Sequence, residues 1–243
     1  MTKVDSMRKI FVSFAALALL ATIGGGMAFA TDNPLHGKII ALDAGHGEVA
    51  DNGTMVNGAT NMIDGILVTE AEVNWDVVQA LETKLKNTYG THVVVAERLS
   101  SRKDRVNDAI AKCAALDLDG VVGADNRKCD ALVSVHHNGS TDHGYDGTLV
   151  IYNEKKDKPL AEKMLAALTP LTGNSDGLEN GGYGMTVYGN LVSVITEAYY
   201  ITNDDEARLW LSGTKTPQEV DAQITGLTNY FASQTGGKGG KPR

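Results

Sequence analysis

Residues 130–138 read Asp130-Ala131-Leu132-Val133-Ser134-Val135-His136-His137-Asn138, an apolar run of strand length that ends on two histidines. The run is continuous rather than alternating, which is typical of a strand buried on both faces of a parallel sheet. Similar apolar runs recur at residues 38–42, 92–96, 148–152 and 191–196. We therefore expect these segments to form the strands of a sheet that is covered on both sides.

Amphipathic segments separate the strands. The clearest begins at Thr69, which can cap a helix with Glu72 closing a capping box. Its apolar residues recur at helical spacing, at Val73, Val77, Leu81 and Leu85. Further helices are expected near residues 106–113, 160–168, 203–210 and 216–231. The alternation predicts an α/β fold: a single-domain three-layer α/β/α sandwich with a mostly parallel central sheet.

The first thirty residues have the pattern of a secretory signal peptide. Three basic residues precede an apolar run over residues 10–23, and Ala28-Phe29-Ala30 provides a small-x-small cleavage site. The alternative is a membrane anchor, but this run is short for a bilayer span. We expect a signal peptide at residues 1–30, a catalytic domain at residues 31–235 and a flexible tail at residues 236–243. The protein would then be exported, and is expected to be periplasmic or extracellular.

Charge and composition restrict the partners of the exported chain. Loss of residues 1–30 would take the formal net charge from −8 to −10, because that segment carries three basic residues and one acidic residue. Such an acidic chain has no basic patch for nucleic acid, and recognition of any anionic polymer would have to be local. No second apolar segment approaches spanning length, so no membrane contact is expected after cleavage.

Cys113 and Cys129 are the only cysteines in the chain. Export would make a disulfide between them possible, and we expect that bond. The alternative is two unpaired thiols, because Cys113 occupies an apolar position of a predicted helix.

Four side chains suited to hydrolytic chemistry lie at strand ends or at a helix start. His46 follows the first strand through the turn Asp43-Ala44-Gly45, and His136 ends the third strand. Glu70 lies in the first turn of a helix, where the dipole favours an ionised carboxylate, and Glu197 ends the fifth strand. Ligands collect beyond the carboxyl ends of parallel strands, so we expect the four to converge.

Two histidines and a carboxylate form the ligand set of a catalytic zinc site, and a further glutamate can transfer protons. Each residue also has a structural interpretation: His46 as a turn residue, Glu70 as a favourable helix-start residue, His136 as a core histidine. Glu197 could pair with an arginine. Their joint placement favours a zinc hydrolase with metal ligands His46, Glu70 and His136 and the catalytic residue Glu197.

The other histidines are not expected among the metal ligands. His137 follows His136 directly and should point to the opposite side of the strand. His143 lies in a glycine-rich stretch and is a reserve ligand, whereas His36 and His92 are expected to be structural or exposed.

Between residues 38 and 211 the chain resembles the zinc-dependent N-acetylmuramoyl-L-alanine amidases, a family of cell-wall hydrolases. Four motifs carry the resemblance, in order: Asp43-Ala44-Gly45-His46-Gly47, Glu70-Ala71-Glu72-Val73-Asn74, residues 130–138, and Val194-Ile195-Thr196-Glu197 followed by Ile201-Thr202-Asn203. The resemblance implies Zn²⁺ held by His46, Glu70 and His136, with Glu197 as the proton-transfer group. It also implies peptidoglycan as the substrate, cut at the amide between N-acetylmuramic acid and L-alanine of the stem peptide.

The chain departs from the family pattern at two places near these motifs. A small residue is usual where His137 stands, and glycine-phenylalanine is usual near Ala198-Tyr199. Residues 114–128 also form a longer connection than usual. A short loop, residues 139–147, replaces the long inhibitory helix of some relatives. The changes at His137 and at Ala198-Tyr199 concern substrate preference more than chemistry.

Two other interpretations remain open from the sequence. One is another zinc peptidoglycan hydrolase, either a carboxypeptidase or a deacetylase. A carboxypeptidase needs an arginine for the substrate carboxylate, and Arg98, Arg102 and Arg105 are available. The other is a non-catalytic wall-binding module, which the presence of Glu197 beside three ligands argues against. The sequence leaves open the oligomeric state and whether a protein activates or recruits the enzyme.

Overall fold

The computed structural model describes residues 33–119 and 126–235. The predicted signal peptide, residues 1–30, and the predicted tail, residues 236–243, lie outside the described residues. Within the described ranges, no helix combines the length and the apolar character needed to cross a bilayer.

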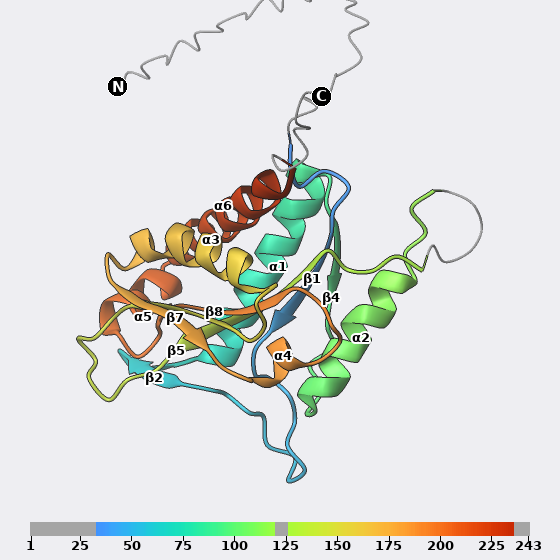
Figure 1. The fold of residues 1–243 in the computed structure, drawn as a ribbon. Helices are drawn as coiled ribbons and strands as arrows, with labels where there is room; N and C mark the ends of the chain where they lie inside the picture. The colour runs from blue at the N-terminus through green and yellow to red at the C-terminus, as the bar shows by residue number, and fades with distance from the viewer. Residues whose placement is uncertain (1–32, 120–125, 236–243) are drawn as a thin grey trace, which may run out of the picture. The chain divides into compact units, whose positions relative to one another are not determined.

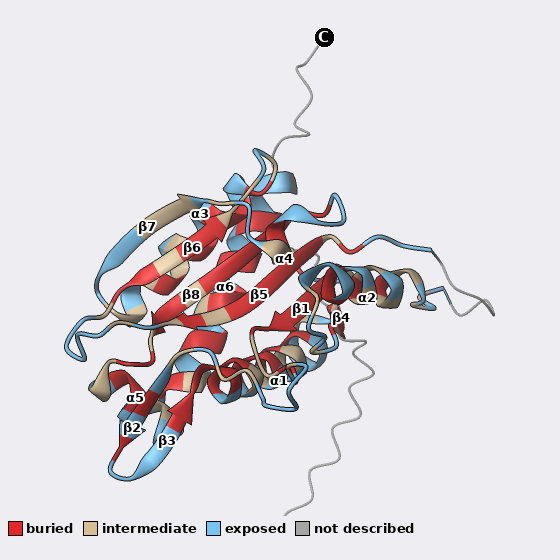
Figure 2. Cartoon of the chain, turned by 90° about the horizontal axis from the view of Figure 1, so that it is seen from below, coloured by how far each residue is buried: buried red, intermediate tan, exposed pale blue. Residues whose placement is uncertain are grey.

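A six-stranded sheet runs through the fold (Figure 1), and its strand order is β4-β1-β5-β8-β6-β7 (Figure 2). Neighbouring strands are parallel, except that β6 runs antiparallel to β8. The mostly parallel sheet and its five expected strands are therefore confirmed. The strands are β1 (Ile39–Ala44), β4 (His92–Val95), β5 (Ala131–Asn138), β6 (Thr148–Tyr152), β7 (Ser175–Asn180) and β8 (Ser193–Tyr200).

Helices cover both faces of this sheet, as Figure 2 shows. On one face lie α1 (Glu70–Tyr89), α3 (Lys158–Leu168) and α6 (Lys215–Thr235). On the other face lie α2 (Arg102–Ala114) and the short α4 (Gly184–Val187). A 3-10 turn (Thr169–Leu171) follows α3, and α5 (Asp204–Leu211) follows β8. The arrangement is the α/β/α sandwich that the sequence predicts.

Successive residues of β1 point to opposite faces of the sheet and are buried on both. Ile40 and Leu42 belong to the core beneath α1, α3 and α6, whereas Ile39 and Ala41 belong to the core beneath α2 and α4. This two-sided burial explains why the strand is continuously apolar in sequence.

A hairpin of β2 (Thr60–Ile63) and β3 (Ile66–Thr69) was not expected from the sequence. Its turn residues, Asp64 and Gly65, both have positive φ, at 52° and 85°. A two-residue type I′ turn requires that conformation and favours Asp-Gly. Strand β7 is also unexpected, because it lies at the sheet edge and is mostly polar.

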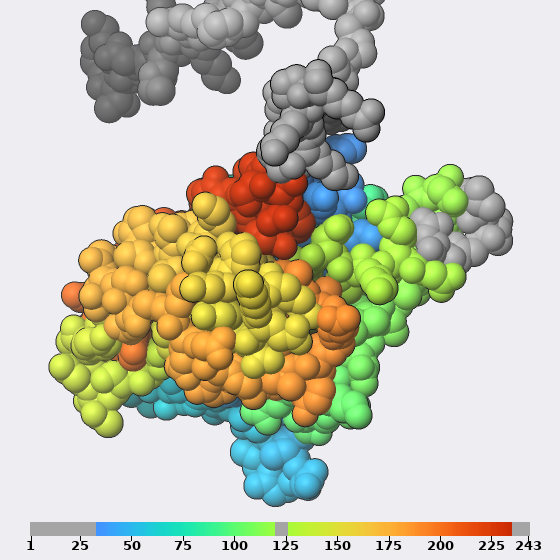
Figure 3. Space-filling view, viewed as in Figure 1, coloured from blue at the N-terminus to red at the C-terminus, as the bar shows by residue number. Residues whose placement is uncertain are grey.

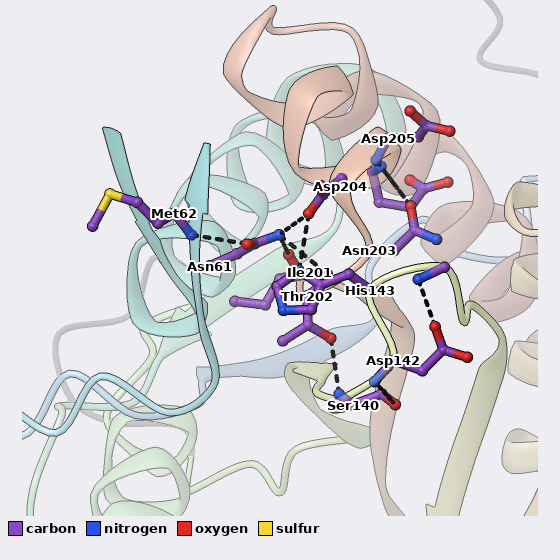
Figure 4. A network of polar contacts seen from close by, with 12 residues as sticks. Asn61, Met62, Ser140, Asp142, His143, Ile201, Thr202, Asn203, Asp204 and Asp205 are labelled. Atoms are coloured by element: carbon purple, nitrogen blue, oxygen red, sulfur yellow. Dashed lines mark hydrogen bonds and ion pairs between the residues drawn. The ribbon is translucent and has the colours of Figure 1, made fainter. Parts of the chain in front are cut away.

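The hairpin is fixed to the segment that follows β8. The Asn61 side-chain amide donates to the carbonyl oxygens of Ile201 at 3.2 Å and Thr202 at 3.1 Å, and to the Asp204 carboxylate (Figure 4). Because β3 runs directly into α1, these bonds also fix where α1 begins.

The first residues of α1 show the expected N-cap at Thr69, but the Glu72 carboxylate meets the Thr69 hydroxyl instead of the backbone N–H of a capping box. The Thr69 hydroxyl accepts from the Glu72 backbone N–H at 3.2 Å, and donates to the Glu72 carboxylate at 2.9 Å. Glu70, the first residue of the helix, is thereby placed at the positive end of the helix dipole.

The predicted disulfide between Cys113 and Cys129 is confirmed. It joins the end of α2 to the residue two positions before β5, with the Cα atoms 5.5 Å apart. The bond therefore connects the helix on one face to a central strand.

Replacing Cys113 and Cys129 together by alanine should lower the free energy of unfolding by about 3 kcal/mol, because a cross-link across a loop of this length mainly restricts the unfolded chain. Urea denaturation of parent and variant measures the difference. Reduction of the parent should produce a similar loss, and equal stability of the reduced and oxidised parent would contradict the prediction.

Candidate active site

Parallel pairing brings the carboxyl ends of β1, β5 and β8 to one edge of the sheet. Ala44 pairs with Val135, and His136 pairs with Glu197. His46 lies two residues beyond β1, and α1 brings Glu70 to the same edge. His46, Glu70 and His136 each present one ligand atom, and these three atoms lie within 4.8 Å of one another. The convergence expected from the strand ends is therefore present in the fold.

Glu70 lies between the two histidines and is 4 % exposed. Its Oε1 is 2.9 Å from His136 Nδ1, and its Oε2 is 3.2 Å from His46 Nε2 and accepts from the Ala59 N–H at 2.9 Å. Burial raises the pKa of Glu70, but the hydrogen bonds from His136 and His46 outweigh that effect and hold the pKa well below its usual value. Glu70 is therefore an ionised carboxylate.

Two glycines make room for this cluster. A Cβ atom at Gly45 would lie 2.3 Å from the His136 ring, and one at Gly58 would lie 2.3 Å from Glu70 Oε2. His46 itself has a φ of 58°, in the left-handed region that is uncommon for residues other than glycine. The turn after β1 is therefore shaped around the side chains of the cluster.

Glu197 faces the same edge and is not part of the three-residue cluster. Its Oε2 atom is buried and has no hydrogen-bond partner among the described residues. Burial raises the pKa of Glu197 to about 7, although the charge of His136 opposes the shift. The carboxylate is therefore free to bond to a molecule that enters the site.

The residues present fit a zinc ion. His46 Nδ1 is buried and, like Glu197 Oε2, has no hydrogen-bond partner in the described part of the chain. Buried polar atoms are nearly always partnered, so Glu197 Oε2 is expected to face a ligand. His46 directs its other nitrogen, Nε2, toward Glu70. Two imidazoles and one ionised carboxylate are the nitrogen and oxygen donors found in catalytic zinc sites.

A cavity of about 410 Å³ opens over this edge. His46, His136 and Glu197 line it, and apolar side chains of β6 and β8, including Leu149 and Ile195, form another part of its wall. Apolar walls with a few convergent polar groups are typical of sites that bind small molecules or short segments of a polymer.

A buried ion pair beside the cavity was not predicted from the sequence. Arg105 Nε donates to Asp43 Oδ1 at 2.9 Å, and Ser134 Oγ donates to Asp43 Oδ2 at 2.6 Å. Arg105 also donates to the Ala44 carbonyl oxygen and lies 3.6 Å from Glu48. These bonds join α2, β1 and β5 directly beneath the His46 turn.

The three arginines considered for a substrate carboxylate differ in their contacts. Arg105 is committed to Asp43, and Arg98 donates to the Ala71 carbonyl oxygen at 2.6 Å. Arg102 and Arg105 both line the cavity, but the Arg102 side chain makes no hydrogen bond or ion pair with the described residues. Arg102 is therefore the best placed of the three to meet a substrate.

The other histidines lie outside the cluster. His137 points away from the cavity and contacts Asn74 and Glu219 on the opposite side of β5. The reserve ligand His143 is exposed and pairs with Asp204 at 3.0 Å (Figure 4). His36 and His92 are absent from the described group of candidate ligands.

A His-Glu-His cluster with a nearby carboxylate, at the carboxyl edge of a parallel sheet, defines a candidate metal-dependent hydrolase. A model of the N-acetylmuramoyl-L-alanine amidase family matches residues 40–229. The chain belongs to this family.

Two curated relatives are similar over most of this chain. LytC, an N-acetylmuramoyl-L-alanine amidase of Bacillus subtilis, is 29 % identical over 203 residues, covering 82 % of this chain and 36 % of LytC. LytH, a probable cell wall amidase of Staphylococcus epidermidis, is 27 % identical over 207 residues, covering 84 % of this chain and 62 % of LytH. The chain thus spans about a third of the first relative and less than two thirds of the second.

Among solved structures, the CwlD amidase of Clostridioides difficile, in complex with the GerS lipoprotein, has a similar fold. The TM-score is 0.63 at 20 % identity, over 81 % of this chain and 99 % of that one. The likeness supports the α/β/α sandwich.

Replacing Arg105 by methionine should lower the free energy of unfolding by about 3–5 kcal/mol, because Asp43 would remain buried without its cation. Ser134→Ala removes only one hydrogen bond to the same carboxylate and should cost about 1.5–3 kcal/mol. Urea denaturation gives both values. A smaller loss for Arg105→Met than for Ser134→Ala would show that the ion pair does not stabilise this part of the fold.

Proposed function

We propose that this chain is a zinc-dependent peptidoglycan hydrolase that cleaves the amide bond between N-acetylmuramic acid and L-alanine of the stem peptide. The observation that carries the proposal is the convergence of His46, Glu70 and His136 with Glu197 at one cavity, inside the region that matches the amidase family.

His46, Glu70 and His136 would hold the zinc ion. When bound, zinc supplies a Lewis acid that polarises a carbonyl group and lowers the pKa of a coordinated water to about 7. Glu70 contributes the negative charge of the ligand set, and the two imidazoles contribute neutral nitrogen donors. The glycines at positions 45 and 58 keep the three side chains close together.

Glu197 is the proton-transfer group of the proposal. Its carboxylate takes a proton from the attacking water and delivers it to the leaving nitrogen of L-alanine, as a general base and then a general acid. A cation nearby favours the ionised form of a carboxylate, so Glu197 begins the reaction as a base. Its unpartnered Oε2 atom is available to accept that proton.

We also propose that the chain is exported, with residues 1–30 as the signal peptide, residues 31–235 as the catalytic domain and residues 236–243 as the tail. Peptidoglycan as a substrate requires a periplasmic or extracellular location, and this agrees with the basic, apolar and small-residue pattern of residues 1–30. A protein partner is a further candidate, because the CwlD structure is that of a complex with GerS.

Purified sacculi distinguish this proposal from its rivals. The protein with zinc should release stem peptides that carry a new L-alanine amino terminus and should leave glycan strands with intact N-acetyl groups. Mass spectrometry of the soluble products identifies both. Release of D-alanine alone would indicate a carboxypeptidase, acetate alone would indicate a deacetylase, and no product would favour a wall-binding module.

Glu197→Gln should keep the fold and the zinc but lower turnover by about 10²–10⁴-fold, because the amide has nearly the same shape and cannot accept the proton. His136→Ala is the comparison variant and should lose the zinc itself. Metal analysis and sacculus digestion measure the two effects. Turnover of Glu197→Gln within a few-fold of the parent would exclude Glu197 as the base.

A further inference from the structure

A network of buried polar side chains lies on the side of β5 that faces away from the cavity. At its centre, His137 is 1 % exposed. Its Nδ1 lies 2.6 Å from Asn74 Oδ1 on α1, and its Nε2 lies 2.9 Å from Glu219 Oε2 on α6. Asn74 and Glu219 are each 0 % exposed, so water does not replace these contacts.

The surrounding acceptors fix the orientation of the Asn74 amide. Its Nδ2 donates to the Gly45 carbonyl oxygen at 2.8 Å and to Glu70 Oε1 at 3.4 Å. Both of those atoms are acceptors only, so the amide oxygen must face His137. The nitrogen of His137 that meets this oxygen therefore donates, and the other nitrogen faces a carboxylate. Both ring nitrogens are thus engaged away from the metal ligands.

Asn74 links this network to two parts of the proposed metal site. Gly45 directly precedes His46, and Glu70 is the carboxylate ligand. On the other side, Gln223 Nε2 contacts Glu219 Oε1 at 3.3 Å and Thr196 Oγ1 at 2.9 Å. The network therefore also reaches the residue before Glu197.

We propose that His137 is a positioning residue that acts through Asn74 on Glu70 and on the Gly45–His46 turn, with Glu219 holding the imidazole in place. The inference rests on the metal site of the proposed function. A donor at His137 Nδ1 keeps the Asn74 oxygen turned away from the site, and its NH₂ group turned toward Gly45 and Glu70. Without that donor, the buried Asn74 oxygen would have no partner in the described network, and only the two acceptors would hold the amide.

Groups that orient metal ligands typically change metal affinity by about 10–100-fold when removed. We expect His137→Leu and Asn74→Ala each to raise the zinc dissociation constant by a factor in this range. Because both changes interrupt the same path, the double variant should be little weaker than either single variant. If the two changes were independent packing defects, their factors on the zinc dissociation constant would instead multiply in the double variant.

Tyr199 provides the matched control. Its ring lies 4.3 Å from that of His137, and its hydroxyl is buried without a hydrogen-bond partner among the described residues. Tyr199→Phe therefore changes the same buried region and leaves the network intact. Its zinc dissociation constant should stay within about threefold of the parent value.

The experiment measures zinc dissociation constants of the full chain by competition with a chromophoric chelator, and records the visible absorption spectrum of the Co²⁺-substituted protein. His137→Leu and Asn74→Ala should weaken zinc binding and shift the Co²⁺ bands, whereas Tyr199→Phe should do neither. Parent-like affinity and spectrum in Asn74→Ala would overturn the proposal. Multiplicative losses in the double variant would overturn it too.

Glu219→Gln keeps the proposal testable if His137→Leu does not fold. Its NH₂ group can donate to His137 Nε2 while Nδ1 still donates to Asn74, so zinc affinity should remain near that of the parent. Glu219→Ala removes the partner and should weaken binding. Equal affinities in the two variants would contradict the positioning role. A parent chain that binds no zinc would instead overturn the proposed function, and this inference with it.

Discussion

A carboxylate that leaves water needs donors to replace its hydration, and the fold supplies them to Glu70 from four separate segments. The donors lie within 3.4 Å of its two oxygens and are His136 Nδ1, His137 N, Asn74 Nδ2, Ala59 N and His46 Nε2. Asn74 lies on the same helix as Glu70, but the other segments reach Glu70 only when β1 and β5 are paired in register and the hairpin has placed the start of α1. The contacts that stabilise the Glu70 charge therefore depend on the assembled fold.

The positive dipole end of α1 and the two imidazoles stabilise this charge, which explains why the carboxylate stays ionised in spite of burial. The same arrangement leaves His46 Nδ1 without a partner among the described residues. In the proposed enzyme, a cation would interact with His46, Glu70 and His136 at once. The fold would then prepare the site before a metal binds.

Much of the fold is predictable from the sequence, because two-sided burial leaves a continuous apolar signal at residues such as Ile39–Ala44. The cap at Thr69 is equally local, since it needs only a residue three positions further on. The edge strand β7 lacks such a signal, and the hairpin has only the local signal of its Asp64-Gly65 turn. Their residues are largely exposed or polar, and long-range contacts such as that of Asn61 with Ile201 and Thr202 decide their position.

Convergence of His46, Glu70 and His136 is likewise predictable, because the carboxyl ends of parallel strands share one edge. Pairings of buried polar residues were not predictable, since Arg105 finds Asp43 across 62 positions, and His137 finds Glu219 across 82. The periodicity of apolar residues in the sequence indicates which positions are buried. It does not indicate which residue will pair with a buried polar side chain. Each partner comes from an element whose place is known only after the layers are assembled.

Because successive side chains of a strand point to opposite faces, the two adjacent histidines of β5 have different surroundings. His136 and His137 differ by one position, so the pleat of β5 sends the first ring into the cavity and the second into the core beneath α6. The backbone N–H between those rings lies 3.3 Å from Glu70 Oε1. A displacement of the buried His137 ring would therefore move the same stretch of backbone that presents the proposed ligand His136. Because β5 is packed on both faces, a change in the core beneath α6 can affect the residues that the same strand presents to the cavity.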